Sequence, residues 1–220
     1  MRQKTVEEIL AEKIIMIVRG YRGDTLMSLL EAAYDGGIRF AEITYDAKGE
    51  PSDAFTAGQI ADAVSRFAGR MTIGAGTILD PRQVWLTEEA GGRFIISPNT
   101  DPEVINATRE AGLVSIPGAL TPTEAALAVK SGADFVKLFP AGRMGPGYLR
   151  DLAAPLSHIR FLAVGGINAE NLADYAAAGA VGFGISGGIL DRLAIAAGDY
   201  GRIKELAAGL TAAAKAAYAG

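Results

Sequence analysis

Two charged residues stand inside otherwise apolar stretches of this 220-residue chain, and they are the first candidates for chemistry. Lys137 lies within the run Phe135 to Phe139, and Glu42 lies within the run Phe40 to Thr44. Burial lowers the pKa of a lysine, and the neutral amine can then attack a carbonyl carbon. Burial raises the pKa of a carboxyl group, which can then move protons near neutral pH. The two residues together favour carbonyl chemistry with acid–base steps.

Each of these residues also has a structural interpretation. Lys137 could extend from its strand so that its ammonium group reaches water. Glu42 could face Lys137 in an ion pair that only stabilises the core. Buried central strands seldom hold a lone charge, which favours the catalytic interpretation of Lys137. Both interpretations of Glu42 stay open on the sequence.

The composition excludes several other kinds of catalyst. The chain has no cysteine and one histidine, His158. Disulfides, thiolate nucleophiles, iron–sulfur clusters and metal sites with two or more imidazole ligands are therefore excluded. His158 precedes an expected strand, at the end of the fold where residues contribute to stability, so we do not expect it to be catalytic.

The charge pattern also limits the partners of the protein. The formal net charge is −4 and the isoelectric point is about 5.1, with no basic stripe, so nucleic acid is not an expected partner. No apolar run approaches the roughly 18 residues that a membrane-spanning helix needs. Residues 1–13 have a charged, helical pattern and no apolar signal core. We expect a cytoplasmic protein that binds no membrane.

The elements that must position these side chains alternate along the whole chain. Eight apolar, strand-like runs alternate with segments of helical period, and the runs cover residues 14–18, 38–44, 71–75, 93–97, 114–117, 133–139, 160–164 and 181–185. Such alternation predicts a parallel sheet. We expect one α/β domain over residues 1–220, a (βα)8 TIM barrel with a short N-terminal helix. A doubly wound sheet is the alternative, although no G-x-G-x-x-G motif follows the first run.

Helix boundaries have their own signals. Asp80 precedes Pro81 as an N-cap, and Thr121 and Glu124 have the spacing of a capping box. Asn168 is the expected N-cap of a helix over residues 168–178. An alanine-rich helix is expected over residues 200–218.

Barrels of this type place their active site at the C-terminal ends of the strands, so residues there are the candidate ligand contacts. The glycines of the last two strand ends, Gly165, Gly166, Gly187 and Gly188, predict a cradle of backbone N–H groups for a phosphate. They could instead only permit tight turns. Arg19 could bind a carboxylate or phosphate with two N–H groups, or form a surface ion pair.

Several motifs, in order from about Ile14 to Ile203, together resemble the class I aldolases that cleave 2-keto-3-deoxy-6-phosphogluconate (KDPG) and 4-hydroxy-2-oxoglutarate (KHG). The matching pieces are Ile17-Val-Arg-Gly20, Gly36-Gly-Ile38, Glu42-Ile-Thr44, Gly74-Ala-Gly-Thr77, Ile96-Ser-Pro-Asn99, Ile116-Pro-Gly118, Thr121-Pro122, Val136-Lys-Leu-Phe-Pro140, Gly145-Pro146 and Ala163-Val-Gly-Gly-Ile167. A single piece such as Gly-Ala-Gly-Thr is a weak signal, whereas the ordered set is specific.

The resemblance implies a metal-independent lyase without a cofactor, usually a homotrimer, that cleaves such acids to pyruvate and an aldehyde. It implies Lys137 as the Schiff-base lysine and Glu42 as the general acid and base. The other implied contacts are Thr77 and Pro98 at pyruvate, Phe139 beside the imine, and the loops of Gly165, Gly166, Ser186 and Gly187 at the phosphate.

Two positions depart from the family pattern. Many members carry an arginine that binds the pyruvate carboxylate where this chain has Asp46, so Arg19, Thr77 or backbone amides must replace it. Many also have a serine where this chain has Gly188, and Ser186 or amides alone would serve. The alternatives are an aldolase for the 6-phosphogalactonate analogue or for a non-phosphorylated keto acid, another phosphate-binding barrel, and a non-catalytic sugar-phosphate binder.

Overall fold

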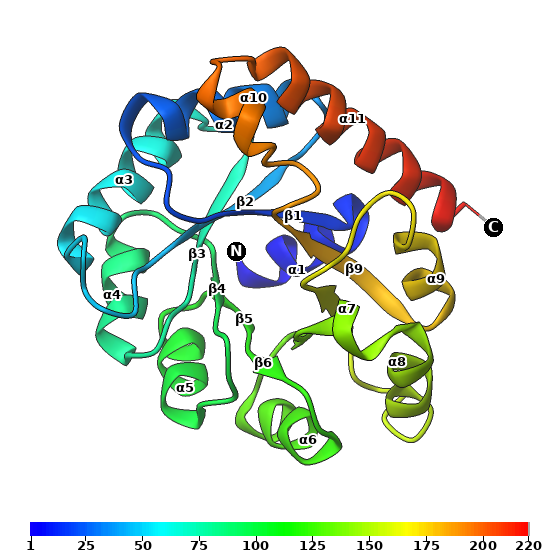
Figure 1. Cartoon of the computed structure of the whole chain (residues 1–220). Coiled ribbons are helices and arrows are strands. Elements are labelled where there is room, and N and C mark those ends of the chain that lie inside the picture. Colours follow the sequence, from blue (N-terminus) through cyan, green and yellow to red (C-terminus); the bar gives the residue numbers. More distant parts are fainter. Residues whose placement is uncertain (220) are drawn as a thin grey trace.

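Nine parallel strands form one sheet that curls into a nearly closed barrel in the computed structural model, which describes residues 1–219 (Figure 1). The strands are β1 (Ile14–Val18), β2 (Phe40–Thr44), β3 (Thr72–Gly76), β4 (Phe94–Ile96), β5 (Val114–Ile116), β6 (Gly118–Ala119), β7 (Val136–Leu138), β8 (Phe161–Val164) and β9 (Ala180–Ile185). Their order is β5-β4-β3-β2-β1-β9-β8-β7-β6. The predicted parallel α/β barrel is confirmed as an architecture, and every strand except β6 overlaps one of the predicted runs.

The described residues contain nine strands, where the sequence predicts eight, because a short further strand, β6, follows Pro117, the last residue of the fifth run. β5 pairs with β4, and β6 pairs with β7 on the other side. Proline has no backbone N–H, so it cannot donate a hydrogen bond to a neighbouring strand. Its carbonyl oxygen still accepts a hydrogen bond from the backbone N–H of Lys137 at 2.8 Å.

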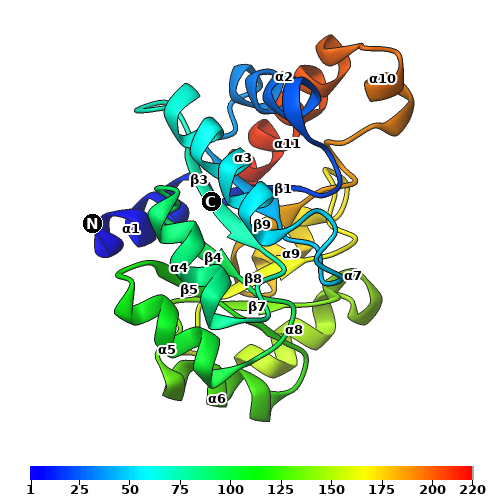
Figure 2. The same cartoon turned by 90° about the vertical axis from the view of Figure 1, so that its left-hand side faces the viewer.

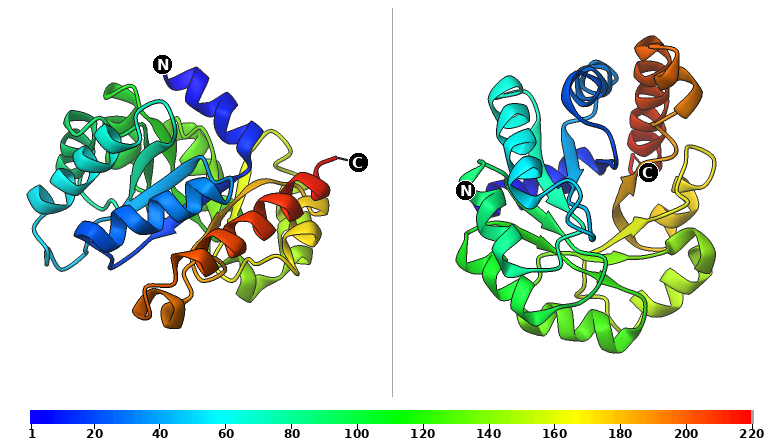
Figure 3. Two further views of the ribbon diagram at one scale, coloured as in Figure 1. Left: turned by 90° about the horizontal axis from the view of Figure 1, so that it is seen from above. Right: turned by 60° about the vertical axis from the view of Figure 1, so that its left-hand side comes forward.

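Helices surround the sheet, as the two views of Figure 3 show. They are α1 (Arg2–Glu12), α2 (Gly23–Asp35), α3 (Asp53–Arg66), α4 (Pro81–Glu89), α5 (Pro102–Glu110), α6 (Pro122–Ser131), α7 (Ala141–Met144), α8 (Pro146–Ala153), α9 (Leu172–Ala177), α10 (Arg192–Ala196) and α11 (Tyr200–Ala217). Among residues 1–219, no helix has the length and apolar character needed to cross a membrane.

The expected helix starts are confirmed at two positions and wrong at a third. The Asp80 side chain accepts a hydrogen bond from Arg82 N at the start of α4, and Thr121 forms a capping box with Glu124 at the start of α6. Asn168 does not begin a helix, since α9 begins at Leu172. The Asn168 side chain instead accepts hydrogen bonds from the backbone N–H groups of Glu170 and Asn171, in the turn between Asn168 and α9.

The N-terminal end of the barrel is closed by α1. Val6 and Ile9 of this helix pack in one apolar cluster with Phe40, Phe94 and Phe135, which lie at or beside the starts of their strands. Figure 2 shows α1 at one end of the barrel and α7 at the opposite end. Apolar side chains therefore fill the N-terminal half of the barrel interior, and the interior space for a ligand lies at the C-terminal end.

A paired charge ties α1 to the sheet. Arg2 donates two hydrogen bonds to Asp134, at 3.0 Å from Nε and 2.6 Å from Nη2. Asp134 also accepts a hydrogen bond from Ser115 N, at 3.0 Å. This carboxylate therefore connects the closing helix to strand β5.

Packing between α2 and α11 (Figure 1) gives a stability prediction at Gly36, because a Cβ added there would lie 2.5 Å from Ala207 Cβ and 2.6 Å from the Lys204 carbonyl oxygen. Overpacking of this kind costs about 1–3 kcal/mol, so Gly36→Ala should lower the free energy of unfolding by that amount in urea titrations. Gly209→Ala in α11 is the matched control, since nothing lies within 4 Å of its added Cβ. In this control the free energy of unfolding should rise by about 0.5–1 kcal/mol, because alanine is favoured over glycine inside a helix. Equal effects of the two variants would contradict the packing argument.

Candidate active site

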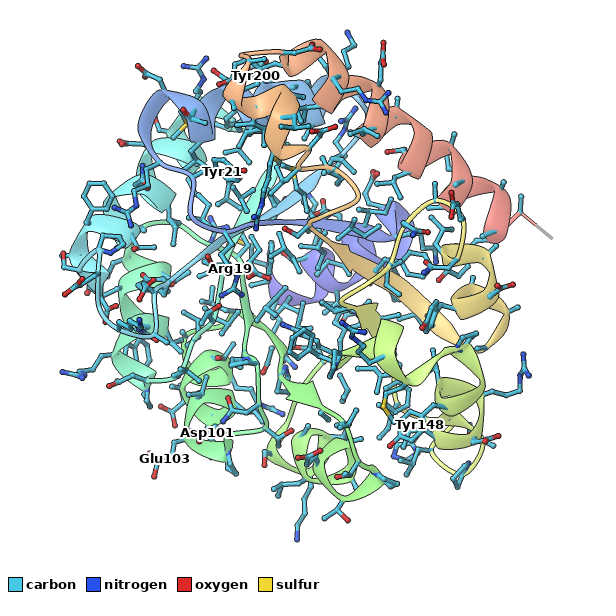
Figure 4. All side chains as sticks on the ribbon, in the orientation of Figure 1. Arg19, Tyr21, Asp101, Glu103, Tyr148 and Tyr200 are labelled. Atoms are coloured by element: carbon cyan, nitrogen blue, oxygen red, sulfur yellow. The ribbon has the colours of Figure 1, made fainter. Side chains whose placement is uncertain are left out.

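A cavity of about 590 Å³ opens at the C-terminal ends of the strands. Nine of the ten predicted site residues line it, namely Arg19, Thr77, Pro98, Lys137, Phe139, Gly165, Gly166, Ser186 and Gly187. Glu42 is the exception, because its side chain is buried in β2 with 1% of its surface exposed. Arg19 lies near the middle of the ring of strands in Figure 4. The structure therefore gathers residues from most of the barrel strands around one space.

Lys137 occupies the middle of β7 and is 6% exposed. Burial lowers its pKa, Glu42 opposes that shift, and the nearby charge of Arg19 adds to it. The ammonium nitrogen lies 4.7 Å from the centre of the Phe139 ring, which is exposed and also lines the cavity. The expected lowering of the lysine pKa is therefore present at a position that a ligand can reach.

The pKa of Glu42 is shifted upward, whereas that of Lys137 is shifted downward. Burial raises the Glu42 pKa to about 7, against the opposing effects of the positive charges on Lys137 and Arg19. Its Oε2 atom is buried, with no hydrogen-bond partner in residues 1–219. A carboxyl group with such a pKa is present in both protonation states near neutral pH, as proton transfer in both directions requires.

The direct ion pair considered for Glu42 is absent from the described part of the chain. No nitrogen of Lys137 lies within 4.0 Å of a Glu42 oxygen. The two groups still influence each other's pKa, so they interact through space across the barrel. The interpretation of Glu42 as one half of a closed structural ion pair is therefore wrong.

Arg19 and Thr77 are joined at the cavity wall. Arg19 Nη2 donates a hydrogen bond to Thr77 Oγ1 at 3.1 Å. Thr77 has a φ of +59°, a left-handed conformation that is strained for a β-branched residue and costs about 1–3 kcal/mol. Arg19 forms no ion pair within residues 1–219. Its remaining N–H groups are available to an anionic ligand.

The glycine-rich loops after β8 and β9 offer backbone donors. Gly165 and Gly166 have φ values of +89° and +79°, which require glycine. The backbone N–H groups of Gly166, Gly187 and Gly188 donate no hydrogen bond to other residues in the range 1–219. The turn after β8 therefore requires Gly165 and Gly166, whereas Gly187 and Gly188 have no positive φ. The phosphate cradle stays a prediction, with three backbone N–H groups beside the cavity as its candidate donors.

Asn171 is a residue that the sequence reasoning missed. Its Nδ2 donates to the Gly166 carbonyl oxygen at 2.9 Å, and its Oδ1 accepts from Asn168 N at 2.9 Å. These two bonds hold the loop after β8 in its turn. The Asn-x-x-Asn spacing from Asn168 was the available signal, but it resembles the start of a helix.

Asp46 and His158 lie outside the main cavity. Asp46 accepts a hydrogen bond from Lys48 N at 2.7 Å and lines a neighbouring cavity of about 300 Å³ that shares Arg19 with the main one. His158 is exposed in the loop before β8, at the N-terminal end of the barrel, as expected. No group of three or more histidine, aspartate or glutamate side chains that could hold a metal ion occurs in residues 1–219.

The chain is similar in sequence to named aldolases. A family model described as KDPG and KHG aldolase matches residues 6–206. A probable 2-dehydro-3-deoxy-6-phosphogalactonate aldolase from Rhizobium meliloti is 36% identical over 208 residues, which are 94% of this chain and 93% of that protein. A KHG/KDPG aldolase from Escherichia coli is 34% identical over 181 residues, 81% of each chain.

The fold is also similar to that of a solved aldolase. A structure of KDPG aldolase from Legionella pneumophila matches with a TM-score of 0.83 and 25% identity, over 96% of this chain and 98% of that one. In that protein, pyruvate is captured at low pH as a covalent carbinolamine intermediate.

The opposing charges at the site give a prediction for the Glu42 pKa. The positive charge of Lys137 lowers that pKa, so Lys137→Met should raise it above about 7. Carbon-13 NMR of labelled glutamate carboxyl groups measures the titration, with the signal assigned by its loss in Glu42→Gln. Lys48→Met is the control, because Lys48 is exposed and is not among the charges that shift this pKa. A Glu42 signal that titrates near the usual value of about 4.3 would contradict the burial argument.

Proposed function

Because the chain belongs to the KDPG and KHG aldolase family, we propose that it is a class I aldolase acting through a Schiff base on Lys137. Its substrate is a 2-keto-3-deoxy-6-phospho sugar acid, cleaved reversibly to pyruvate and an aldehyde. The observation that carries the proposal is a buried lysine of lowered pKa at the wall of a ligand-sized cavity. The carbinolamine of the Legionella relative supports it, because this is the adduct of an amine with a ketone.

The reaction begins at the Lys137 nitrogen. The neutral amine attacks the C2 ketone, and loss of water leaves a protonated imine that withdraws electrons from C3. Glu42 accepts the proton of the C4 hydroxyl as the C3–C4 bond breaks and the aldehyde leaves. The pair of electrons from that bond remains as an enamine. Glu42 then returns a proton to C3, and water hydrolyses the imine to release pyruvate and the free lysine.

The two ends of the substrate need separate anchors. We assign the carboxylate of the keto acid to Arg19 and Thr77, because Asp46 cannot attract an anion and lies in the neighbouring cavity. Pro98 lines the pyruvate pocket, and Phe139 packs beside the imine. The 6-phosphate is assigned to the free N–H groups of the loops that contain Gly165, Gly166, Ser186 and Gly187.

The candidate substrates are KDPG, its 6-phosphogalactonate epimer and KHG. The sequence-based expectation is KDPG or KHG, giving glyceraldehyde 3-phosphate or glyoxylate. The Rhizobium relative, which matches along nearly its whole length, supports the 6-phosphogalactonate analogue as a second candidate. Both share the same C1 to C3 chemistry at Lys137 and Glu42, so the choice does not affect the proposed mechanism.

Three further properties are part of the proposal. β5 and β6 act as two halves of one strand, which would give eight βα units around the barrel. The enzyme is cytoplasmic. It needs no metal ion, because the protonated imine accepts the electrons that a metal ion would otherwise stabilise. It assembles as a homotrimer, an expectation from the family that light scattering of the purified chain tests.

Trapping of the imine tests the proposed chemistry. After incubation with pyruvate and borohydride, mass spectrometry should find a pyruvate-sized adduct on Lys137. Lys137→Met should form no adduct and have no aldolase activity. Glu42→Gln should still form the adduct but turn over about 10²–10⁴-fold more slowly, because only proton transfer is lost. An active wild-type protein without an adduct would refute the Schiff-base mechanism.

A substrate panel tests the phosphate assignment. The ratio kcat/KM should be higher for the 6-phosphorylated acids than for their dephosphorylated forms, and the two phosphorylated epimers should differ from each other. Asn171→Ala should raise KM for the phosphorylated substrate, because the loop after β8 loses its two hydrogen bonds. Pyruvate adduct formation should be unchanged in that variant. Equal kcat/KM with and without the phosphate would contradict the assignment.

A further inference from the structure

The side chain of Glu42 occupies space above a glycine of the neighbouring strand. In the ladder between β2 and β3, Glu42 pairs with Gly74 and Thr44 pairs with Gly76. Residues two apart on a strand share a face, so Gly76 presents its Cα on the face from which Glu42 projects. A Cβ built on Gly76 would lie at covalent-bond distance from Glu42 Oε1 and would also overlap Cδ and Cγ.

Space, and not backbone conformation, is what requires glycine at this position. The φ of Gly76 lies outside the left-handed region, so an alanine could adopt the same backbone conformation. Gly165 and Gly166 differ in this respect, because their positive φ values disfavour any side chain. The three heavy atoms nearest to the methyl group of an alanine at position 76 would all belong to the Glu42 side chain.

The carboxyl group has little else to hold it. No hydrogen bond from residues 1–219 reaches its buried Oε2 atom, and no ion pair of 4.0 Å or less joins it to Lys137. No polar contact within residues 1–219 therefore fixes this carboxyl group, and the bare Cα of Gly76 provides the space in which it lies.

We propose that Gly76 is a positioning residue for Glu42, because the side chain it lacks leaves the space in which the catalytic carboxyl group is held. This inference rests on the proposed function of Glu42 as proton donor and acceptor. A methyl group at position 76 displaces the carboxyl group and leaves the Lys137 amine in place. It therefore separates two steps that share one cavity, imine formation and proton transfer.

Exchange of the pyruvate methyl protons in D₂O measures the second step alone. The imine of pyruvate on Lys137 gives a C3 proton to the Glu42 carboxylate, and an enamine forms. The carboxyl proton exchanges with solvent, and Glu42 returns a deuteron to C3. Proton NMR follows the loss of the methyl signal, while borohydride trapping measures imine formation independently.

Gly76→Ala should exchange the methyl protons about 10²-fold more slowly than the wild type, a loss typical for removal of a general base. Its borohydride adduct on Lys137 should form as in the wild type. The midpoint of its exchange–pH profile should also fall, because a displaced carboxyl group is nearer to water and its pKa moves down from about 7. Gly58→Ala in α3 is the matched control, since nothing lies within 4 Å of its added Cβ and its φ is unexceptional. The control should leave all three measurements unchanged.

A double-mutant cycle separates this role from a general packing defect. In a Glu42→Ala background the space above Gly76 is empty, so adding Gly76→Ala should change neither the thermal midpoint nor the residual exchange rate. In the wild-type background the same substitution should lower both. If Gly76→Ala alone does not fold, the double variant should fold.

Three results would overturn the inference. The first is that Gly76→Ala exchanges the pyruvate methyl protons at the wild-type rate. The second is that this variant loses both the borohydride adduct on Lys137 and the exchange. The third is that Gly76→Ala lowers the thermal midpoint equally in the wild-type and Glu42→Ala backgrounds. Failure of the proposed function looks different, because the wild type itself would then form no adduct and exchange no methyl protons. In that case the positioning role of Gly76 is refuted as well, and the double-mutant cycle of positions 42 and 76 measures only a packing contact.

Discussion

The burial of two opposite charges inside one parallel sheet is the constraint on which the rest of the structure depends. Lys137 and Glu42 are nearly inaccessible to water, and burial shifts the pKa of each toward neutrality. Contact within 4.0 Å would hold both groups in their charged forms, because each would stabilise the other. Their separation avoids this. An amine that can be neutral and a carboxyl group that can be protonated are thereby both present inside the barrel.

The barrel maintains this arrangement by closing one end and opening the other. The helix α1 covers the N-terminal end with Val6 and Ile9, and the pair of Arg2 and Asp134 ties it to the sheet. The cavity that Lys137 lines lies at the opposite end, where the strands have their C-terminal ends. Because every strand runs in the same direction, polar side chains from distant parts of the sequence meet there.

Glycine has two separate roles around the site. Gly165 and Gly166 provide backbone conformations that leave N–H groups free beside the cavity. Gly76 and Gly118 provide space, because a Cβ on Gly76 would collide with Glu42 and one on Gly118 would collide with the Pro98 carbonyl oxygen. The first role depends on local turns, and the second depends on how closely neighbouring strands pack.

The sequence by itself determined the alternation of strands and helices, the caps at Asp80 and Thr121, and the two charges in apolar strands. These are local properties, since periodicity, capping and a charge within an apolar run depend on residues a few positions apart. It did not determine the break at Pro117, the loop contacts of Asn171 or the gap between Lys137 and Glu42. Tertiary structure decided these, because distances across a closed sheet depend on strand register and side-chain direction, which no short segment encodes.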